Sequence, residues 1–314
     1  MEIFPQILLS GASGLIGNAL RRSLAAQGLQ STMLVRSAPQ PGSSAIFWNP
    51  YATGTRDDLQ LDVRRIEGMR AAIHLSGDNL SIGRWTEAKK KRIWVSRVIT
   101  TQALVRILTH LESPPEVLIC ASAVGYYGNR GEEILTEDSP SGDGYLAELC
   151  VAWEQAADAA RQRGIRVVPL RFGVVLARGG GALVKMLPLF KTGLGGRLGN
   201  GRQWMSWISL PDIVRIVDRV LSDASLKGPI NAVAPHLVTN AEFTRTLAHI
   251  LHRPALIAAP AFVLRAAFGE MADAALLAST RVLPARLENA DFVFQHATLD
   301  AALHAAFSSG NAAS

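Results

Sequence analysis

The feature that most constrains this chain is a set of three glycines that follows its first apolar segment. The run Ile-Leu-Leu-Ser at 7–10 is followed by Gly11, Gly14 and Gly17, and a helical pattern covers 18–27. This order predicts a β-strand, a tight turn and the start of a helix. Gly11 would permit the turn, Gly14 would let a ligand approach the backbone, and Gly17 would let the helix pack closely on the strand. Free N–H groups at such a helix start bind phosphates, so the segment predicts a dinucleotide site.

The end of the second predicted strand indicates which dinucleotide to expect. Proteins that bind NAD usually carry Asp or Glu at this point, where the carboxylate binds the ribose 2′-hydroxyl. The strand at 31–36 ends instead in Arg36, and Ser37 follows it. A guanidinium suits a 2′-phosphate, so the sequence predicts NADP(H) rather than NAD(H). The alternative is that Arg36 is an ordinary solvated arginine at a strand end.

Apolar segments with strand character alternate with helical patterns through the first half of the chain. The strand candidates are 7–10, 31–36, 71–75, 117–121 and 167–171, and the helix candidates between them include 86–111 and 146–163. This alternation is typical of an α/β fold with a Rossmann-type doubly wound parallel sheet. Glycine-rich loops and proline breaks follow, which predicts a smaller C-terminal substrate lobe. We expect the nucleotide-binding domain over 1–178 plus about 208–235, and the smaller lobe over 179–207 and 236–314.

Composition limits the kind of protein and its partners. The 314 residues are 48% hydrophobic and 18% charged, which suits a globular protein with a full core. The two cysteines form no disulfide framework, and neither they nor the histidines have metal-ligand spacing. No apolar run is long enough to span a bilayer, so we expect a cytoplasmic protein with no membrane partner and no metal. The net charge of +6 is dispersed, and the basic run at 89–92 fits a solvated helix face, so no nucleic-acid partner is expected.

Several further segments give the chain a resemblance to a known family. The glycine loop at 11–17, the strand end at 74–77 and the segment 170–176 occur in the order found in extended short-chain dehydrogenase/reductases, the group of nucleotide-sugar epimerases and dehydratases. Within this group the chain resembles the atypical branch called epimerase family proteins, which carry a small C-terminal domain of unknown function. The matching segments span nearly the whole chain and include 84–87, 96–97, 122–128, 193–196, 203–208, 240–243, 252–254 and 269–271.

The resemblance implies an NADP(H) site that is larger than the glycine loop. It places cofactor contacts on that loop, on two strand ends and on a helix arginine that periodicity would assign to the solvated surface. Ser37 extends the set beside Arg36, and Ser122 is expected to face the nicotinamide from the end of its strand. The predicted cofactor residues are therefore Gly11, Ser13, Gly14, Leu15, Ile16, Gly17, Arg36, Ser37, Leu75, Ser76, Gly77, Arg97, Ser122 and Val174.

The usual acid–base pair of the superfamily is missing from the sequence. Active members use a tyrosine whose phenolate is stabilised by a lysine four residues further on. None of the four tyrosines has lysine at that spacing, because the residues found there are Thr55, Arg130, Gly131 and Leu149. The remaining candidates for proton transfer are Ser122 and the loop residues Tyr126 and Tyr127. Ala123 could occupy the usual hydroxyl position in place of Ser122, and both tyrosines could instead pack the loop.

Three other polar residues have ordinary structural interpretations. His74 ends a buried strand and is expected to be a satisfied core histidine rather than a base. Glu148 and Glu154 lie in the helix candidate at 146–163 and are expected to be solvated.

Two functions fit these features. The first is an NADP(H)-dependent oxidoreductase or epimerase that acts on a small polar, sugar-nucleotide-like substrate in the cleft between the lobes. The second is a non-catalytic NADP(H)-binding sensor or regulator that keeps the nucleotide site without the acid–base pair. A homodimer through a pair of helices is common in the superfamily and is one expected assembly. Oxidation of NADPH by a carbonyl compound would distinguish the two functions.

Overall fold

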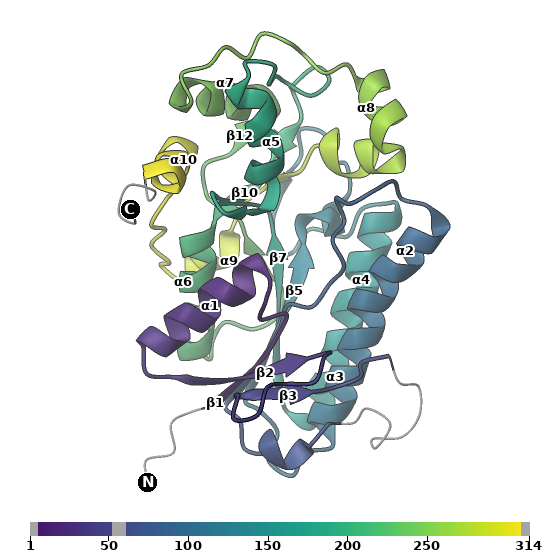
Figure 1. Cartoon of the computed structure of the whole chain (residues 1–314), viewed down its shortest axis with the longest axis vertical. Coiled ribbons are helices and arrows are strands. Elements are labelled where there is room, and N and C mark those ends of the chain that lie inside the picture. The colour runs from purple at the N-terminus through teal and green to yellow at the C-terminus, as the bar shows by residue number, and fades with distance from the viewer. Residues whose placement is uncertain (1–5, 52–60, 309–314) are drawn as a thin grey trace.

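The computed structural model describes residues 6–51 and 61–308, and a seven-stranded sheet lies at its centre (Figure 1). Its strand order is β11-β7-β5-β4-β1-β2-β3, and every neighbouring pair is parallel. This sheet confirms the predicted Rossmann-type doubly wound α/β class. The strands are β1 (Gln6–Ser10), β2 (Gln30–Val35), β3 (Ala45–Phe47), β4 (Ala71–His74), β5 (Val117–Ala123), β7 (Arg166–Phe172) and β11 (Ile230–Ala232).

The register of the central strands places their carboxyl ends at one edge of the sheet. Ser10 of β1 pairs with His74 of β4, and His74 pairs with Cys120 of β5. Ligands of open α/β sheets bind beyond this edge, so the loops that leave β1, β4 and β5 are the ones that can form a site.

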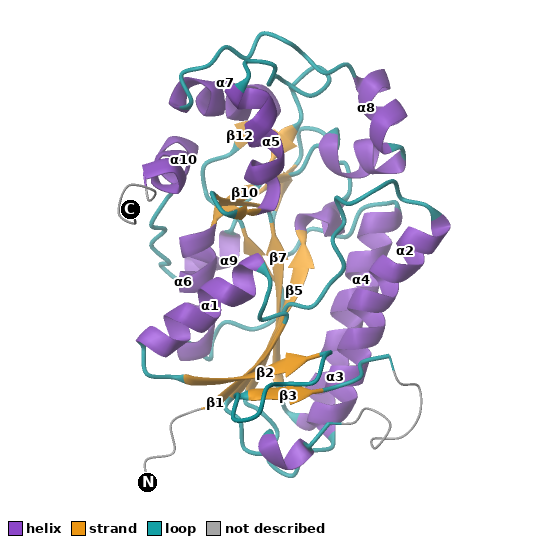
Figure 2. Cartoon of the chain, viewed as in Figure 1, coloured by secondary structure: helices purple, strands orange, loops and turns teal. Residues whose placement is uncertain are grey.

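Helices cover both faces of the sheet (Figure 2). On one face α1 (Leu15–Ala26) packs with α6 (Leu210–Ser222), and on the other α3 (Thr100–Thr109) packs with α4 (Tyr145–Asp158). The predicted helix at 86–111 is present as α2 (Glu87–Trp94), a π-helical turn η3 (Val95–Ile99) and α3. The π turn contains Arg97, and such turns inside α-helices frequently occur at functional sites.

Alternation along the central strands builds a core on each face. Leu9, Ile73 and Ile119 belong to the cluster beneath α1 and α6, whereas their neighbours Leu8, Ala72 and Leu118 belong to the cluster beneath α3. Successive side chains of a strand point to opposite faces, so strands buried on both faces are apolar throughout. Burial on both faces therefore explains the apolar runs from which the strands were predicted.

The remaining elements lie beyond the carboxyl edge or return to the sheet. They are β6 (Ile134–Leu135), β8 (Val174–Ala177), α5 (Gly181–Lys191), β9 (Trp204–Met205), β10 (Trp207–Ser209), β12 (Val238–Thr239), α7 (Asn240–Ile250), α8 (Ala261–Phe268), β13 (Arg281–Val282), α9 (Ala285–Asn289) and α10 (Leu299–Ser308). The pairs β10-β8, β12-β9 and β13-β6 form two-stranded sheets. None of the helices within 6–51 and 61–308 is long and apolar enough to cross a membrane. The division into a domain at 1–178 plus 208–235 and a lobe at 179–207 and 236–314 stays a prediction.

Candidate nucleotide-binding site

The loop between β1 and α1 has a shape that its glycines alone permit. Gly11 has a φ of +72°, and a Cβ there would lie 2.7 Å from the carbonyl carbon of Leu75 and 3.0 Å from the nitrogen of Ser76. A Cβ on Gly17 would lie 2.2 Å from the carbonyl oxygen of Gly11, so a side chain would push α1 away from β1. The loop, α1 and the end of β4 are therefore held in close contact.

The start of α1 is prepared for an anion. Its N-cap is Gly14, which makes no side-chain capping bond, and the first turn holds no acidic residue. The N–H groups of this turn have no carbonyl partner within the helix, and the helix dipole is positive at this end. A phosphate placed here would satisfy both the N–H groups and the dipole.

A buried arginine lies behind the end of β4. Arg97 is 8% exposed, and a Cβ on Gly77 would lie 3.1 Å from its Cζ atom. Arg97 Nη2 donates to the carbonyl oxygen of Asp78 at 3.0 Å, and its Cζ lies 5.2 Å from the ring centre of Trp153. Burial lowers the pKa of Arg97.

Within the described parts of the chain, no carboxylate forms an ion pair with Arg97. The side chain of Asp78 is instead bound by Lys89 Nζ at 2.8 Å. A buried charge without a counter-charge is costly, and that cost is recovered when an anion binds beside it. Arg97 and the glycine loop that leads into α1 therefore both contact the 75–77 segment, and Arg97 and the start of α1 both favour a negatively charged ligand.

Arg36 and Ser37 are exposed where β2 ends, next to β1 in the sheet. Arg36 Nη1 donates to the phenol oxygen of Tyr51 at 3.0 Å, which holds the guanidinium at this edge. A 2′-phosphate beside Arg36 would receive a charge-assisted hydrogen bond.

The other predicted cofactor residues lie at the same edge. Ser13 is exposed in the glycine loop, and Leu15 and Ile16 open α1. A Cβ on Gly180 would lie 2.9 Å from Leu15 Cδ1, so the segment that follows β8 packs on the glycine loop. Val174 begins β8, and its N–H donates to the carbonyl oxygen of Ser206 at 2.8 Å.

A buried polar cluster lies beneath the end of β5. Ser122 Oγ donates to Glu154 Oε1 at 2.6 Å, and Arg171 Nε and Nη2 bind the two oxygens of Glu154, each at 2.8 Å. The side chains of Arg171 and Glu154 are 3% and 12% exposed. Burial by itself would lower the pKa of Arg171, but the hydrogen bond and the charge of Glu154 raise it. The expectation that Glu154 is solvated is wrong, because Arg171 extends from β7 toward α4 at this point.

The two candidate tyrosines of η4 (Val124–Tyr127) have different surroundings. Tyr127 is fully buried, and its hydroxyl lies 2.7 Å from Asn231 Oδ1 and accepts from Arg171 Nη1 at 2.9 Å. Burial raises the pKa of Tyr127 to about 12. Tyr126 is half-buried, and the Arg171 guanidinium lies 3.5 Å from its ring centre. Of the three proposed catalytic residues, Ser122 and Tyr127 are enclosed and Tyr126 keeps accessible surface.

His74 lies directly below the glycine loop. It is fully buried, its Nδ1 lies 2.5 Å from Ser10 Oγ, and its Nε2 has no hydrogen-bond partner among the residues that the structure describes. Burial lowers the pKa of His74 to about 4. The structure thus places it in the core as expected, although one ring nitrogen is left unpaired.

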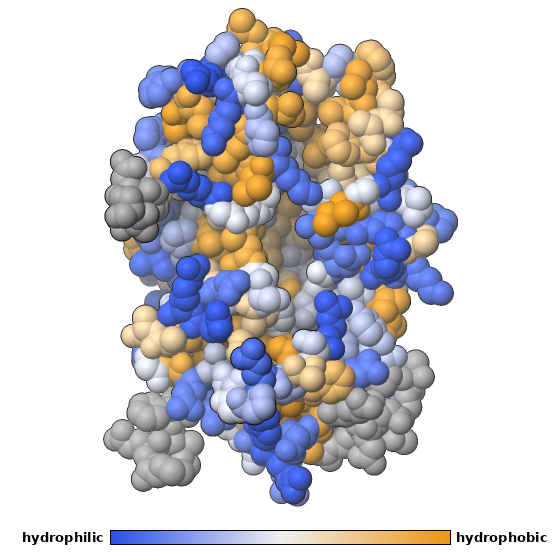
Figure 3. Space-filling view, in the orientation of Figure 1, coloured by the Kyte–Doolittle hydropathy of each residue, from blue (hydrophilic) through white to orange (hydrophobic). Residues whose placement is uncertain are grey.

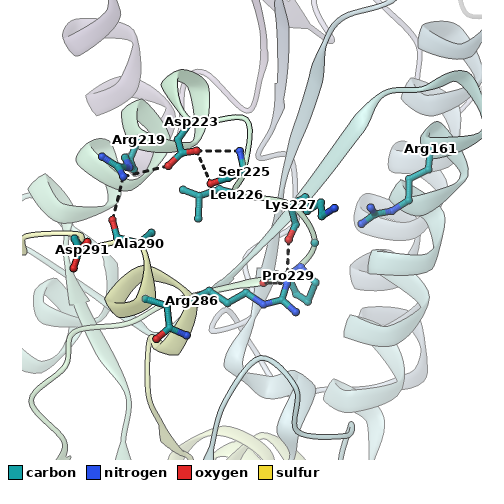
Figure 4. A pocket seen from close by; sticks show the side chains of 12 residues that line it. Arg161, Arg219, Asp223, Ser225, Leu226, Lys227, Pro229, Arg286, Ala290 and Asp291 are labelled. Carbon is teal, nitrogen blue, oxygen red and sulfur yellow. Dashed lines mark hydrogen bonds and ion pairs between the residues drawn. The ribbon is translucent and has the colours of Figure 1, made fainter.

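A separate hollow lies at the opposite edge of the sheet (Figure 4). It has a volume of about 800 Å³ and is lined by the end of α6, the 223–229 loop and α9. Its arginines donate to backbone carbonyls, Arg161 to that of Val167, Arg219 to that of Ala290 and Arg286 to that of Lys227. These bonds tie chain segments together near the amino ends of β7 and β11, so the hollow is not part of the candidate nucleotide site.

The parallel sheet and the glycine loop at its carboxyl edge define a Rossmann-type dinucleotide-binding protein of the short-chain dehydrogenase/reductase kind. The model of the NAD dependent epimerase/dehydratase family matches residues 7–233, and that of a domain of unknown function, DUF1731, matches 259–306. The chain belongs to the NAD-dependent epimerase/dehydratase family. The predicted resemblance to epimerase family proteins with a C-terminal domain of unknown function is thereby confirmed.

Relatives that match nearly the whole chain occur in bacteria and in animals. An epimerase family protein of Mycobacterium bovis is 42% identical over 297 residues, which cover 95% of this chain and 96% of that protein. A crystal structure of the human epimerase family protein SDR39U1 with NADPH has a TM-score of 0.84 and 35% identity, and it covers 95% of this chain and 97% of that one. A nucleoside-diphosphate sugar epimerase from Corynebacterium glutamicum has a TM-score of 0.76 and 35% identity, and the match covers 96% of this chain and 57% of that one.

Proposed function

We propose that this chain is an NADP(H)-dependent oxidoreductase or epimerase that acts on a small molecule with a polar reacting group. The proposal rests on three groups that lie around the glycine loop at the carboxyl edge of the sheet. They are the uncapped start of α1, the buried guanidinium of Arg97 and the exposed guanidinium of Arg36. These are the groups that the pyrophosphate and the 2′-phosphate of NADP(H) require.

Each predicted residue has a role in this proposal. The backbone of 13–17 and Arg97 would bind the pyrophosphate, and Arg36 with Ser37 would bind the 2′-phosphate. Leu75, Ser76 and Gly77, which lie between the glycine loop and Arg97, would contact the cofactor next to the pyrophosphate. Val174, whose N–H donates to the carbonyl oxygen of Ser206, would line the nicotinamide half. The cofactor, when bound, supplies hydride transfer to or from a carbonyl carbon. The chain's own part is to exchange a proton at the substrate oxygen, for which Ser122, Tyr126 and Tyr127 remain the candidates.

Among these candidates the surroundings favour Tyr126. Its ring lies under the Arg171 guanidinium, which keeps a positive charge close to the phenol, and it retains accessible surface. Ser122 is 3% exposed and already donates to Glu154, and Tyr127 is enclosed. Both would then fix the loop that carries Tyr126.

The relatives support the choice of cofactor and suggest a substrate to test. The human relative is described with NADPH, and the Corynebacterium relative is named a nucleoside-diphosphate sugar epimerase. Sugar nucleotides are therefore one class of compound to screen.

A non-catalytic NADP(H)-binding sensor is the second candidate. It is favoured by the missing Tyr-Lys pair in the sequence and by the engagement of the Ser122 and Tyr127 hydroxyls within the protein. Tight NADPH binding without NADPH oxidation across a broad panel of carbonyl compounds would support the sensor over the enzyme.

The cofactor assignment is tested by titrating NADPH and NADH into the wild type and Arg36→Asp. We expect the wild type to prefer NADPH and the variant to lose about 10- to 100-fold in NADPH affinity, because a charge-assisted hydrogen bond is replaced by repulsion. Affinity for NADH should change little. Arg245→Asp, which makes the same charge change on the exposed surface of α7, should behave as the wild type. Equal wild-type affinity for both nucleotides would exclude Arg36 as the 2′-phosphate contact.

A further inference from the structure

Exposed apolar side chains are concentrated in one region of the molecule. Nine of the twelve large hydrophobic residues that are exposed within the described ranges lie on α5, on α8, on the segments next to them or on the loop before α2. They are Ile82, Val184, Leu189, Leu194, Leu256, Ile257, Phe262, Val263 and Phe268. In Figure 3 apolar side chains gather over α5 and α8 on the face shown. Large apolar patches on a protein surface mark sites that contact a ligand, a membrane or another protein.

Contacts between segments show that the 78–86 loop, α5 and α8 border one opening. Lys185 of α5 donates to the carbonyl oxygen of Ser81 at 2.8 Å. Arg84 Nη2 donates to the carbonyl oxygen of Ala266 in α8 at 3.0 Å. Ile82 is 61% exposed and lies in the chain between these two anchors, so it is held between α5 and α8.

The exposed face of α5 is turned toward this loop. Val184, Lys185, Pro188 and Leu189 are exposed and share one face at helical spacing, while Leu183 and Phe190 are buried on the other. Because Lys185 reaches Ser81, the apolar side chains beside it border the same opening as Ile82. Figure 3 shows the molecule hollowed near the centre of this face, between α5 and the segment that leads to α2.

This apolar surface begins next to the candidate nucleotide site. The segment that leads into α5 packs on the glycine loop, since a Cβ on Gly180 would lie 2.9 Å from Leu15 Cδ1. The same segment follows β8, whose first residue, Val174, is proposed to line the nicotinamide half, so the face of α5 with Val184 and Leu189 extends outward from the candidate cofactor site. A substrate whose reacting group lies next to the nicotinamide could therefore contact α5 with the rest of its structure.

Three basic side chains that border the opening are engaged by the protein itself. Lys185 is bound to Ser81, Arg84 to the carbonyl of Ala266, and Lys90 to Glu270 at 2.5 Å. A diphosphate needs cations that are free to bind it. These three would each have to give up a protein partner, whereas an apolar ligand requires no such exchange.

We infer that this surface binds an apolar chain or ring of the substrate, so that the substrate is amphipathic, with a polar reacting group and an apolar remainder. The inference rests on the proposed function, because the reacting group must lie at the nucleotide site. Val184, Leu189 and Ile82 would contact the apolar part next to that site.

The test is the equilibrium binding of 2-alkanones with four to ten carbons, measured by calorimetry with and without NADP+. In the wild type each added methylene should raise the affinity about two- to fourfold. Ile82→Ser combined with Leu189→Ser should flatten this dependence. Both side chains are exposed, so the double variant should fold. Val293→Ser, at an exposed apolar residue outside this region, should keep the wild-type dependence.

Three outcomes would overturn the inference. The first is an affinity that does not depend on chain length, or depends on it equally in the wild type and the double variant. The second is binding of nucleoside-diphosphate sugars without binding of any alkanone. The third is a wild-type dimer in sedimentation velocity that the double variant dissociates, which would make the surface an interface between copies. Chain-length dependence in a protein that fails to bind NADPH would support the apolar site and count against the proposed function alone.

Discussion

At the scale of single residues, Arg97 shows what a pattern can hide. Its position in a helical segment gives it the ordinary interpretation of a solvated arginine, and resemblance alone marked it as a cofactor contact. The structure buries its guanidinium against Gly77, because the π turn of η3 directs this residue toward the end of β4. The depth of burial follows from how two distant segments pack, and no local periodicity records that.

His74 leads to a prediction about pH. Its pKa is about 4 in the folded chain and near 6.5 when exposed. Well above pH 6.5 neither state binds a proton at this ring, but between 6.5 and 4 the unfolded state mostly does and the folded state mostly does not. The free energy of unfolding should therefore fall as pH falls through this window, by about 3 kcal/mol in total.

Urea denaturation at several pH values between 7.5 and 4.5 measures this contribution, because this range covers most of the interval between the ordinary pKa of histidine near 6.5 and the lowered pKa of about 4. His74→Gln should lose this part of the pH dependence, because the titrating ring is gone. His304→Gln, at an exposed histidine of α10, should keep the wild-type profile. Identical pH dependence of stability in His74→Gln and the wild type would show that folding does not lower the pKa of His74.

At the scale of elements, the parallel strands and the glycine loop could be predicted because their signals are local. Apolar runs such as 71–75 and 117–121 are strands buried on both faces, and the glycine spacing matches the turn that Gly11 makes. The pairing of Arg171 with Glu154 joins β7 to α4 and has no such signature. A charged residue inside the apolar strand at 167–171 was the available signal, since a buried arginine requires a partner.

This ion pair predicts unequal effects for two carboxylates of the same helix. Glu154→Gln leaves the buried Arg171 guanidinium without a counter-charge and should lower the free energy of unfolding by about 3 kcal/mol or more. Glu148→Gln, on the exposed face of α4, should change it by less than about 0.5 kcal/mol. Urea denaturation of both variants tests this. Equal and small effects would mean that Arg171 finds another partner. They would exclude the Arg171–Glu154 ion pair as the interaction that stabilises the cluster around Ser122.

At the scale of the whole molecule, the two predicted lobes are joined by a shared core. Leu287 of α9 and Leu299 and Leu303 of α10 are buried in the same cluster as Leu9 of β1. The sequence placed all of 236–314 in the smaller lobe, because local patterns do not reveal which distant surface a helix covers. We propose that the division into two lobes describes where ligands bind, and that the two lobes do not unfold independently.

Shared burial predicts that the chain unfolds in one cooperative transition. Leu303→Ala removes a fully buried side chain from the common cluster and should lower the free energy of unfolding by about 2–5 kcal/mol. Leu256→Ala, at a residue that is 90% exposed, should leave it nearly unchanged. Because NADPH would bind at the glycine loop, it should raise the midpoint of the same transition that Leu303→Ala lowers. Two separate calorimetric transitions, with NADPH shifting one and Leu303→Ala the other, would show that the lobes are independent and that the α10 contacts do not support the nucleotide site.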